Sequence, residues 1–551
     1  MSVVSYKIKG GDFENDGAAS RCVKEQLKKV GADPAVVRRA MVAAYEAEMN
    51  VVIHACQGEL RASLHDGQLD VDVVDEGPGI PDIEVAMTPG FSTASAEARQ
   101  LGFGAGMGLP NIKKNSDRFA IESTVGKGTR ISFTIMLKPQ ALYGSGQHAV
   151  HVVAQNCNEC LACIRVCPTQ ALRVFRGKPQ ILDYLCIDCA ACIGACPTGA
   201  LILDGMPAVT DQGADSAEVA LRPSTDTVLI IPTPCLVQCG AGVTPEQVLS
   251  ELAAMGFTDV RVTDPWEAAL RASVVEYAAL TPGQRVPAGA PVISPVCPAI
   301  VNLIETGFPL LIPNIAPFLS GMEAAHTNLD AKRPMSVVLC PCQRTALLSG
   351  GPTANSAVAK PQIIVPSTLR AAVMPRLQGH GELVEPRAPL AEAERSVLQV
   401  SGLRNVLKIL EAVEDGLAGD VAVLELYACQ GGCFGSPLLG VEASLAAYRW
   451  NRSRTRPQSR AEAVRRGRAY SPRRGLRLDA DMTKAIAKLG KINKLTRGLP
   501  CSNCGICGAP TCAALAEDII LGRATREACL RQQQNADRRN TGTTGDQEKA
   551  T

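Results

Sequence analysis

The chain has 551 residues, of which 46% are hydrophobic and 20% charged, so it can form several folded cores and lacks the composition of a disordered chain. Lysine and arginine number 56 against 54 aspartates and glutamates, a balance that gives no overall field to recruit nucleic acid or an anionic membrane. Its apolar stretches are broken by proline and are shorter than the roughly 20 residues of a membrane span, and the first residues lack a secretion-signal pattern. We therefore expect a cytoplasmic protein of several domains, without a membrane or direct nucleic-acid partner.

Cysteine is unusually abundant, with 22 residues against six histidines. Without a secretion signal, such a number favours thiolate metal ligands over a disulfide framework. Only Cys22 and Cys56 precede residue 150, and the other cysteines fall in groups along the chain. Because histidine is scarce, we do not expect most of these cysteines to belong to zinc sites of the mixed Cys/His type.

The first 140 residues predict a helix and several glycine-rich turns around a ligand. Residues 35–58 have helical periodicity, which places Glu46 and Asn50 on one face because they are four residues apart. An alternating strand over residues 69–74 leads into a turn that reads Asp75-Glu-Gly77-Pro-Gly79.

Two further glycine-rich segments follow in the same region. Residues 102–108 carry a glycine at every second position, and Gly126-Lys-Gly128-Thr129 precedes a predicted strand over residues 130–137. Such turns let backbone N–H groups approach phosphates, but the spacing fits neither the Rossmann nor the P-loop pattern. For residues 102–108 alone, a flexible glycine loop is an equally good interpretation.

These elements, in this order, resemble the N, G1, G2 and G3 boxes of the GHKL ATPase superfamily, and especially its anti-sigma-factor kinase branch. The resemblance implies a GHKL α/β sandwich over residues 1–140 that binds ATP with Mg²⁺. Asn50 would hold the metal, Glu46 would activate the nucleophile, and Asp75 would read the adenine amino group. The remaining nucleotide-binding residues that it implies are Gly77, Gly79, Gly102, Gly104, Gly106, Gly108, Gly126, Gly128 and Thr129.

The activity that this resemblance implies is that of an ATP-dependent Ser/Thr kinase or an ATPase. The sequence names no phosphate acceptor, so whether the chain is an enzyme stays open. His54 follows Asn50 by one helical turn, and we interpret it as an ordinary helix residue rather than a phosphorylated histidine.

Residues 157–168 read C-x2-C-x2-C-x3-C-P, and residues 186–197 repeat this pattern. The spacing is that of bacterial two-cluster ferredoxins, in which the fourth cysteine of each run ligates the other cluster. A ferredoxin-like domain over residues 146–208 is therefore expected to carry an electron relay, and zinc is the alternative that the doubled motif disfavours. One 4Fe–4S cluster is expected on Cys157, Cys160, Cys163 and Cys196, and the other on Cys186, Cys189, Cys192 and Cys167.

Residues 222–447 alternate between strand and helix patterns, which predicts an α/β domain. Ligands in open α/β folds sit in loops at strand ends, so thiolates that converge there can cage a cluster. Three loops carry cysteines, and they read Ser294-Pro-Val-Cys297-Pro, Cys340-Pro-Cys342-Gln-Arg-Thr345 and Cys429-Gln-Gly-Gly-Cys433.

These loops, and the stretch from Val301 to Glu323, resemble the large subunit of iron-only hydrogenases. The resemblance implies a hydrogenase-type double lobe with a further 4Fe–4S cluster on Cys297, Cys342, Cys429 and Cys433. Two departures put the family's diiron subcluster in doubt. Val296 replaces a proton-relaying cysteine, and Thr345 replaces a lysine that engages a cyanide ligand.

Valine cannot transfer a proton, and a neutral hydroxyl cannot replace a cation, so we expect the 4Fe–4S cluster without fast hydrogen turnover. Cys340 either lines the pocket or is a packed thiol. Cys235 and Cys239 match no ligand of the family, so we expect them in the core.

Residues 448–498 are rich in arginine and end in a helix predicted over residues 481–495. We interpret them as a basic linker or docking segment, with a solvated connector favoured. Residues 499–532 resemble a small 4Fe–4S domain of redox and corrinoid-linked proteins, with zinc as the alternative and Cys501 as a spare thiol. Residues 533–551 have the composition of a disordered tail. The ligands that the resemblance implies are Cys504, Cys507, Cys512 and Cys529.

The fusion favours a redox- or hydrogen-responsive regulator that couples an iron–sulfur relay of four 4Fe–4S clusters to an ATP-binding output domain. By resemblance, its partners are a sigma factor, an antagonist or a hydrogenase subunit, a redox donor such as ferredoxin, and a second copy of the chain bound through the GHKL domain. The alternative is a hydrogenase or electron-transfer subunit with a non-catalytic nucleotide domain. A third interpretation, in which ATP hydrolysis drives low-potential electron transfer, has no discriminating sequence feature.

Overall fold

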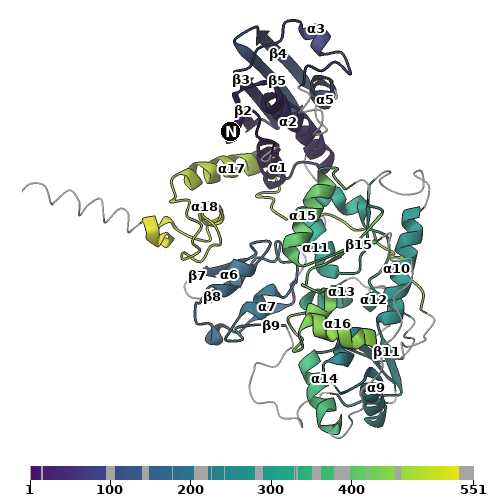
Figure 1. The fold of residues 1–551 in the computed structure, drawn as a ribbon. Helices are drawn as coiled ribbons and strands as arrows, with labels where there is room; N and C mark the ends of the chain where they lie inside the picture. Colours follow the sequence, from purple (N-terminus) through teal and green to yellow (C-terminus); the bar gives the residue numbers. More distant parts are fainter. Residues whose placement is uncertain are drawn as a thin grey trace, which may run out of the picture. The chain divides into compact units, whose positions relative to one another are not determined.

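The computed structural model describes residues 2–13, 17–94, 106–138, 148–175, 178–203, 221–224, 226–240, 242–279, 290–327, 329, 333–349, 361–377, 397–418, 421–452, 461–473 and 475–532. The chain forms two compact units. Unit 1 comprises Met1–Leu142, Leu476–Cys507 and Thr511–Thr551, and unit 2 comprises Tyr143–Gly475 and Gly508–Pro510. Sheets and helices occur in both units, which confirms the expected α/β multidomain class (Figure 1). No helix within the described residues has the length and apolar content needed to cross a bilayer.

Unit 1 is built on an antiparallel five-stranded sheet in the order β1-β2-β3-β5-β4. Its strands are β1 (Ser2–Lys9), β2 (Gln57–His65), β3 (Gln68–Asp75), β4 (Arg118–Thr124) and β5 (Gly128–Met136). Its N-terminal helices are α1 (Ala18–Val30), α2 (Pro34–His54), α3 (Ile83–Ala86) and α5 (Gly108–Asn115). Alternate residues of β3 are buried, as expected for a sheet with one face on a core, and α2 contacts β1, β2, β3 and β5. The predicted helix over residues 35–58 ends at His54, four residues earlier than expected.

The first turn of α1 is capped by a side chain from the neighbouring helix. Gly17 occupies the N-cap position of α1 and provides no side chain, so the first N–H groups need another acceptor. Glu48 of α2 is 2% exposed, and its two carboxylate oxygens accept hydrogen bonds from the N–H groups of Ala19 and Ser20, both at 2.9 Å. This contact fixes α1 against α2.

We expect Glu48→Gln to loosen the start of α1, because an amide has only one acceptor oxygen for two N–H donors. The free energy of opening this turn should fall by about 1–3 kcal/mol, the cost of an unsatisfied buried donor. Hydrogen–deuterium exchange of the peptide covering α1 measures the change. Glu25→Gln, at an exposed position of the same helix, is the control, and equal exchange in both variants would contradict the capping role.

Two C-terminal helices belong to unit 1 as well. Helix α17 (Met482–Arg497) contacts α1, β1 and β2, and α18 (Cys512–Ile520) packs on α17 (Figure 1). The Asn493 amide on α17 donates hydrogen bonds to Ser2 Oγ and Gln26 Oε1, both at 2.9 Å. The C-terminal helices are therefore joined to the N-terminal sheet by specific polar contacts.

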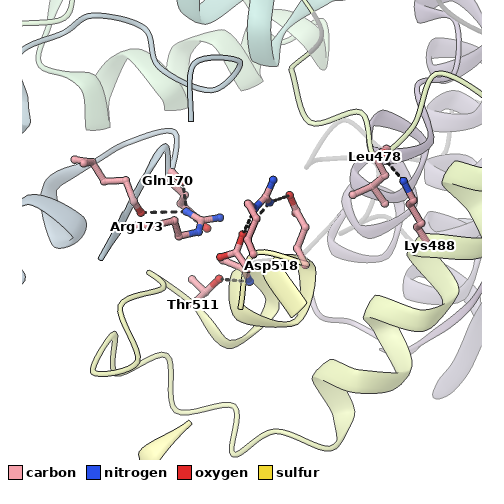
Figure 2. A network of polar contacts seen from close by, with 10 residues as sticks. Gln170, Arg173, Leu478, Lys488, Thr511 and Asp518 are labelled. Carbon is pink, nitrogen blue, oxygen red and sulfur yellow. Dashed lines mark hydrogen bonds and ion pairs between the residues drawn. The ribbon is translucent and has the colours of Figure 1, made fainter. Parts of the chain in front are cut away.

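Further polar contacts join α17 and α18 to the segments that flank them in the sequence (Figure 2). Lys488 on α17 donates to the Leu478 carbonyl at 3.5 Å and pairs with the carboxylate of Asp479 at 2.7 Å. The fully buried Asp518 on α18 accepts from the guanidinium of Arg523 at 2.8 Å. A short 3-10 helix, η8 (Arg526–Ala528), follows α18.

The first part of unit 2 has an approximate internal repeat. Helix α6 (Ala162–Val166) packs against α7 (Ala191–Ala195), and each follows a cysteine turn. Two small antiparallel sheets and one 3-10 helix complete this part. They are β6 (Val150–Val152) with β9 (Leu201–Leu203), β7 (Leu172–Phe175) with β8 (Lys178–Ile181), and η1 (Ala154–Asn156).

The rest of unit 2 contains two parallel sheets, in the orders β11-β10-β13-β14 and β12-β16-β15. Their strands are β10 (Thr227–Ile231), β11 (Asp259–Val262), β12 (Val292–Ile293), β13 (Arg333–Val337), β14 (Gln362–Ile364), β15 (Val397–Ser401) and β16 (Val423–Tyr427). The helices are α9 (Pro245–Ala254), α10 (Asp264–Ala279), α11 (Pro298–Gly307), α12 (Gly321–Ala324), α13 (Pro341–Ser349), α14 (Pro366–Val373), α15 (Leu403–Glu414) and α16 (Ala443–Arg452). The 3-10 helices are η2 (Thr233–Val237), η3 (Pro309–Asn314), η5 (Met374–Leu377) and η7 (Gly432–Gly435). The three predicted cysteine loops follow β12, β13 and β16, so each lies at the carboxyl end of a parallel strand.

Part of the arginine-rich segment packs on unit 2 rather than forming a solvated connector. We call residues 461–473 the arginine strap. Its Val464 carbonyl accepts from the Leu319 N–H at 2.8 Å, Arg466 pairs with the buried Glu323 at 3.2 Å, and Arg473 pairs with Glu305 at 3.0 Å. Because composition alone cannot show which carboxylates a run of arginines meets, the sequence did not predict this packing. Residues 533–551, predicted as a disordered tail, lie outside the described residues.

Candidate functional site

Unit 1 contains a cavity of about 690 Å³ between α2, α5 and the turns that follow β3. This volume lies within the range of small-molecule and cofactor sites. The structure brings most of the predicted nucleotide-binding elements to this cavity. Its lining includes Glu46, Asn50, Asp75, Gly79, Gly106, Gly108 and Thr129. Gly102 and Gly104 lie outside the described residues, and Gly77, Gly126 and Gly128 belong to the adjoining turns.

Asp75 is fixed by the backbone around it. Its Oδ1 atom accepts hydrogen bonds from the N–H groups of Gly77 at 2.8 Å and of Thr129 at 3.2 Å. Gly128 has φ +106°, and a Cβ atom there would lie 2.0 Å from the Asp75 carbonyl oxygen. Only glycine allows the two turns to approach this closely.

Glu46 and Asn50 meet at the α5 side of the cavity. The Asn111 amide of α5 donates to Glu46 Oε1 at 2.7 Å, a contact that the sequence did not predict. Among the described residues, Asn50 Nδ2 is buried without a hydrogen-bond partner. Gly108 leaves room here, because a Cβ atom would lie 3.1 Å from Asn50 Oδ1. The unpartnered Asn50 Nδ2 is a donor that fits a phosphate oxygen, and the Asn50 amide oxygen and the fixed Glu46 carboxylate are of the ligand type that Mg²⁺ prefers.

His54 lies at the end of α2 and lines the same cavity. Burial lowers the pKa of its imidazole, and the nearby Asp75 carboxylate opposes this effect. The structure places this helix residue at the edge of the cavity, a position that the sequence did not predict.

The two ferredoxin motifs share an unusual backbone conformation. Glu159 and Leu161 flank Cys160 with φ of 59° and 60°, and Asp188 and Ala190 flank Cys189 with φ of 58° and 63°. Left-handed conformations of non-glycine residues cost free energy and cluster at ligand sites, where they turn successive N–H groups toward an anion. The same pattern recurs in the C-terminal domain, where Asn503 and Gly505 flank Cys504.

The four cysteines predicted for one ferredoxin cluster line a single cavity, namely Cys167, Cys186, Cys189 and Cys192. Burial raises the pKa of the Cys189 thiol to about 12, and burial together with Asp188 raises that of Cys186. Without a cation these buried thiols keep their protons, whereas bound iron stabilises the thiolates. The set therefore fits an iron–sulfur cluster, which would supply one-electron chemistry.

The cysteines of the other ferredoxin set lie close enough to influence one another electrostatically. Burial raises the pKa of Cys163 to about 11, and the neighbouring Cys196, Cys157 and Cys160 add to the increase. The Sγ atoms of Cys167 and Cys196 each accept an N–H at 3.2 Å, from Ala171 and Ala200 respectively. Hydrogen bonds to sulfur are a general feature of cluster sites and influence their potentials.

The three loops at the strand ends of unit 2 converge on another pocket. All four predicted ligands line it, namely Cys297, Cys342, Cys429 and Cys433. A hydrogen bond from the Cys342 thiol lowers the pKa of Cys297 to about 7 despite burial. Cys189 also lines this pocket, so one ferredoxin ligand lies beside it. Among the described residues, no group of three or more His, Cys, Asp or Glu side chains is arranged around a single metal ion.

The other residues of these loops have distinct positions. Cys340 lines the pocket, with its sulfur 2.7 Å from that of Cys342, and it is also packed in the neighbouring apolar core. Val296 lines the pocket as well. Thr345 instead donates a hydrogen bond to Asp188 Oδ2 at 2.7 Å. Cys235 and Cys239 are buried in an apolar core, as expected.

The C-terminal cysteines differ in exposure, and Cys512 is the first residue of α18. Cys512 and Cys529 are buried, Cys507 is half-buried and Cys504 is exposed. The Cys512 N–H donates to Asn503 Oδ1 at 2.9 Å, and Thr511 caps the helix by accepting from the Ala514 N–H at 3.0 Å. Cys501 is exposed, and its thiol donates to the Thr496 carbonyl at 3.5 Å.

Four family models match the chain. Residues 36–139 match the histidine kinase-, DNA gyrase B- and HSP90-like ATPases, and residues 156–201 match the 4Fe-4S dicluster domain. Residues 228–347 match the C-terminal domain of the iron-only hydrogenase large subunit, and residues 499–531 match a family of Fe–S cluster domains.

Individual proteins resemble single parts of the chain. An anti-sigma F factor of Caldanaerobacter subterraneus subsp. tengcongensis is 38% identical over 109 residues, which are 18% of this chain and 73% of that protein. The serine/threonine-protein kinase RsbT of Bacillus subtilis is 32% identical over 118 residues, which are 21% of this chain and 83% of that protein. A structure of FeFe-hydrogenase HydA1 from Chlamydomonas reinhardtii covers 46% of this chain and 91% of its own at 14% identity, with a TM-score of 0.34.

The chain is thus a fusion of a GHKL ATPase domain, a two-cluster ferredoxin domain, a hydrogenase-like domain and a small Fe–S domain. Through its N-terminal domain it belongs to the family of the anti-sigma F factors and RsbT. The resemblances expected from the sequence are confirmed.

The nucleotide cavity makes a direct prediction about two glycines of one turn. Gly128→Ala should weaken ATP binding at least tenfold, because its Cβ would collide with the Asp75 carbonyl. Gly126→Ala is the matched control, since its φ of +78° is also positive but a Cβ there meets open space. Titration with a fluorescent ATP analogue measures both affinities, and equal affinities would contradict the proposed role of Asp75.

Proposed function

We propose that this protein is a redox-responsive regulator in which iron–sulfur clusters control an ATP-binding, Ser/Thr kinase-type domain that acts on a partner protein. The observation that carries the proposal is the packing of α17 on α1 and β1 within one compact unit. Helix α17 ends at Arg497, and Cys504 follows seven residues later. A change in the C-terminal cluster therefore acts on a helix that is bound to the ATPase sheet.

A second link runs through the chain itself. The arginine strap is held on unit 2 by Glu305 of α11, the helix that begins directly after Cys297. A few residues beyond the strap, the Leu478 N–H donates to the Lys29 carbonyl at the end of α1. Movement of the hydrogenase-like loops would thus reach α1 along the chain that joins the strap to Leu478.

The cluster ligands support an electron path inside unit 2. Cys189 lines both the cavity of its own ferredoxin set and the hydrogenase-like pocket. We propose three 4Fe–4S clusters here and a fourth on the C-terminal cysteines, with a ferredoxin as a suitable donor. A cluster in the pocket would accept electrons, and the occupied state would favour one conformation of the loops.

On the ATPase side, we propose that Asp75, Asn50 and the glycine turns bind ATP together with Mg²⁺. The bound ATP would supply the phosphoryl group. Glu46, held by Asn111, is placed to accept the proton of a Ser or Thr hydroxyl. The partner would be a sigma factor, an antagonist or a hydrogenase subunit, and a second copy of the chain would bind through the same domain.

Glu46→Gln separates the regulator from the alternative of a hydrogenase with a passive nucleotide domain. The variant should lose at least about 100-fold in ATP turnover, as expected for loss of a general base, while its ATP affinity stays within about threefold. Hydrogen-dependent dye reduction should be equal in the variant and the wild type. Unchanged ATP turnover would contradict the assignment of Glu46.

The pocket provides a second test of the same choice. Protein produced anaerobically together with the diiron maturation machinery should show no infrared bands of iron-bound CO or cyanide, because Thr345 lacks the positive charge that engages a cyanide ligand in the family. Iron analysis of the same sample establishes whether the 4Fe–4S clusters are present. Strong CO and cyanide bands would support the hydrogenase alternative and make hydrogen the signal or substrate.

A further inference from the structure

The two ferredoxin motifs carry an acidic residue at the same position, and only one of the two is buried. Glu159 precedes Cys160 and Asp188 precedes Cys189, with φ of 59° and 58°. Glu159 is exposed, whereas Asp188 is 1% exposed. A buried carboxylate is costly unless its environment stabilises it, so its partners reveal its role.

Both oxygens of Asp188 accept hydrogen bonds. Oδ1 accepts from the Ala149 N–H at 2.9 Å, and Oδ2 accepts from the Thr345 hydroxyl at 2.7 Å. These two hydrogen bonds fix the position of the carboxylate. Within the described part of the chain, no lysine, arginine or histidine pairs with Asp188, so its negative charge is not neutralised by a cation.

This charge lies between two sets of cluster ligands. Asp188 Oδ1 is 3.9 Å from the sulfur of Cys186, a ligand of one ferredoxin set. The Asp188 carbonyl accepts from the N–H of Cys342, a ligand of the hydrogenase-like pocket, at 3.0 Å. Asp188 therefore contacts one ligand residue of this ferredoxin set and one of the hydrogenase-like pocket. The hydrogen bond from Thr345 also connects the Asp188 side chain to the pocket loop.

We propose that Asp188 sets the midpoint potential of the cluster held by Cys167, Cys186, Cys189 and Cys192, an inference that rests on the clusters in the proposed function. A one-electron reduction adds negative charge to the cluster, and an adjacent unpaired carboxylate opposes it. Asp188 therefore makes this cluster harder to reduce than it would be without the carboxylate.

Thr345 is the second half of this arrangement. Its neutral hydroxyl holds the carboxylate in place and leaves the charge intact. A lysine at this position would pair with Asp188 and cancel the effect of the carboxylate on the cluster. Asp188 and Thr345 are thus positioning residues, which act on the cluster through charge rather than by ligation.

The test is a redox titration of the full-length, cluster-loaded protein, followed by electron paramagnetic resonance of the reduced clusters. D188N should raise one midpoint potential so that the ratio of reduced to oxidised cluster at fixed ambient potential increases about tenfold, which is 59 mV for a one-electron couple. E159Q, at the equivalent exposed position, is the matched control and should leave every midpoint unchanged. Iron and sulfide analysis verifies that each variant carries its clusters.

A second variant keeps the proposal testable if D188N does not assemble. T345K leaves the carboxylate in place, adds a cation and should raise the same midpoint, with T345S as its control. Unchanged midpoints in fully loaded D188N, or in fully loaded T345K where D188N does not load, would overturn the proposal. In a further outcome, the midpoint shifts in D188N while the affinity for ATP is the same in the oxidised and the reduced protein. That result would support the role of Asp188 and contradict the proposed regulation.

Discussion

Burial of thiols is the constraint on which most of this structure depends. A buried thiolate is unstable unless positive charge lies next to it, and burial raises the pKa values of Cys163, Cys186 and Cys189 accordingly. The chain nevertheless gathers buried and half-buried cysteines at strand ends and in turns with left-handed residues. Iron resolves this conflict because it replaces the protons, so cluster binding and folding of these loops are coupled.

The same coupling explains how an electron could become a structural signal. The pocket lies at the ends of β12, β13 and β16, strands from two different sheets, so its occupant affects both. The loop after β12 continues into α11, which holds the arginine strap through Glu305. In unit 1, α17 connects the C-terminal cysteines to the ATPase sheet. The pocket cysteines and the C-terminal cysteines are thus each followed or preceded by a packed helix, α11 and α17 respectively.

The sequence predicted local features well. The spacing shared with bacterial two-cluster ferredoxins predicted one ligand set, and its four cysteines line one cavity. The resemblance to the GHKL boxes likewise pointed to the glycine turns that meet at Asp75. The helix and strand boundaries were off by only a few residues.

Contacts between distant segments could not be predicted in the same way. Asn493 and Ser2 are 491 positions apart, and nothing in either local pattern links them. Asn111 lies on a short helix whose orientation toward Glu46 depends on the whole sheet. Asp188 has the same motif position as Glu159, and only the packing of Thr345 and Ala149 around it makes it different.

The most direct test of the central claim compares the affinity for ATP of one protein preparation in its oxidised and its chemically reduced state, by equilibrium titration under anaerobic conditions. Coupling between distinct sites is typically worth about 1–3 kcal/mol, so we expect the two dissociation constants to differ by about fivefold or more. Identical affinities in a preparation that contains all its iron, together with identical ATP turnover, would show that the clusters do not control the ATPase domain and would contradict the account.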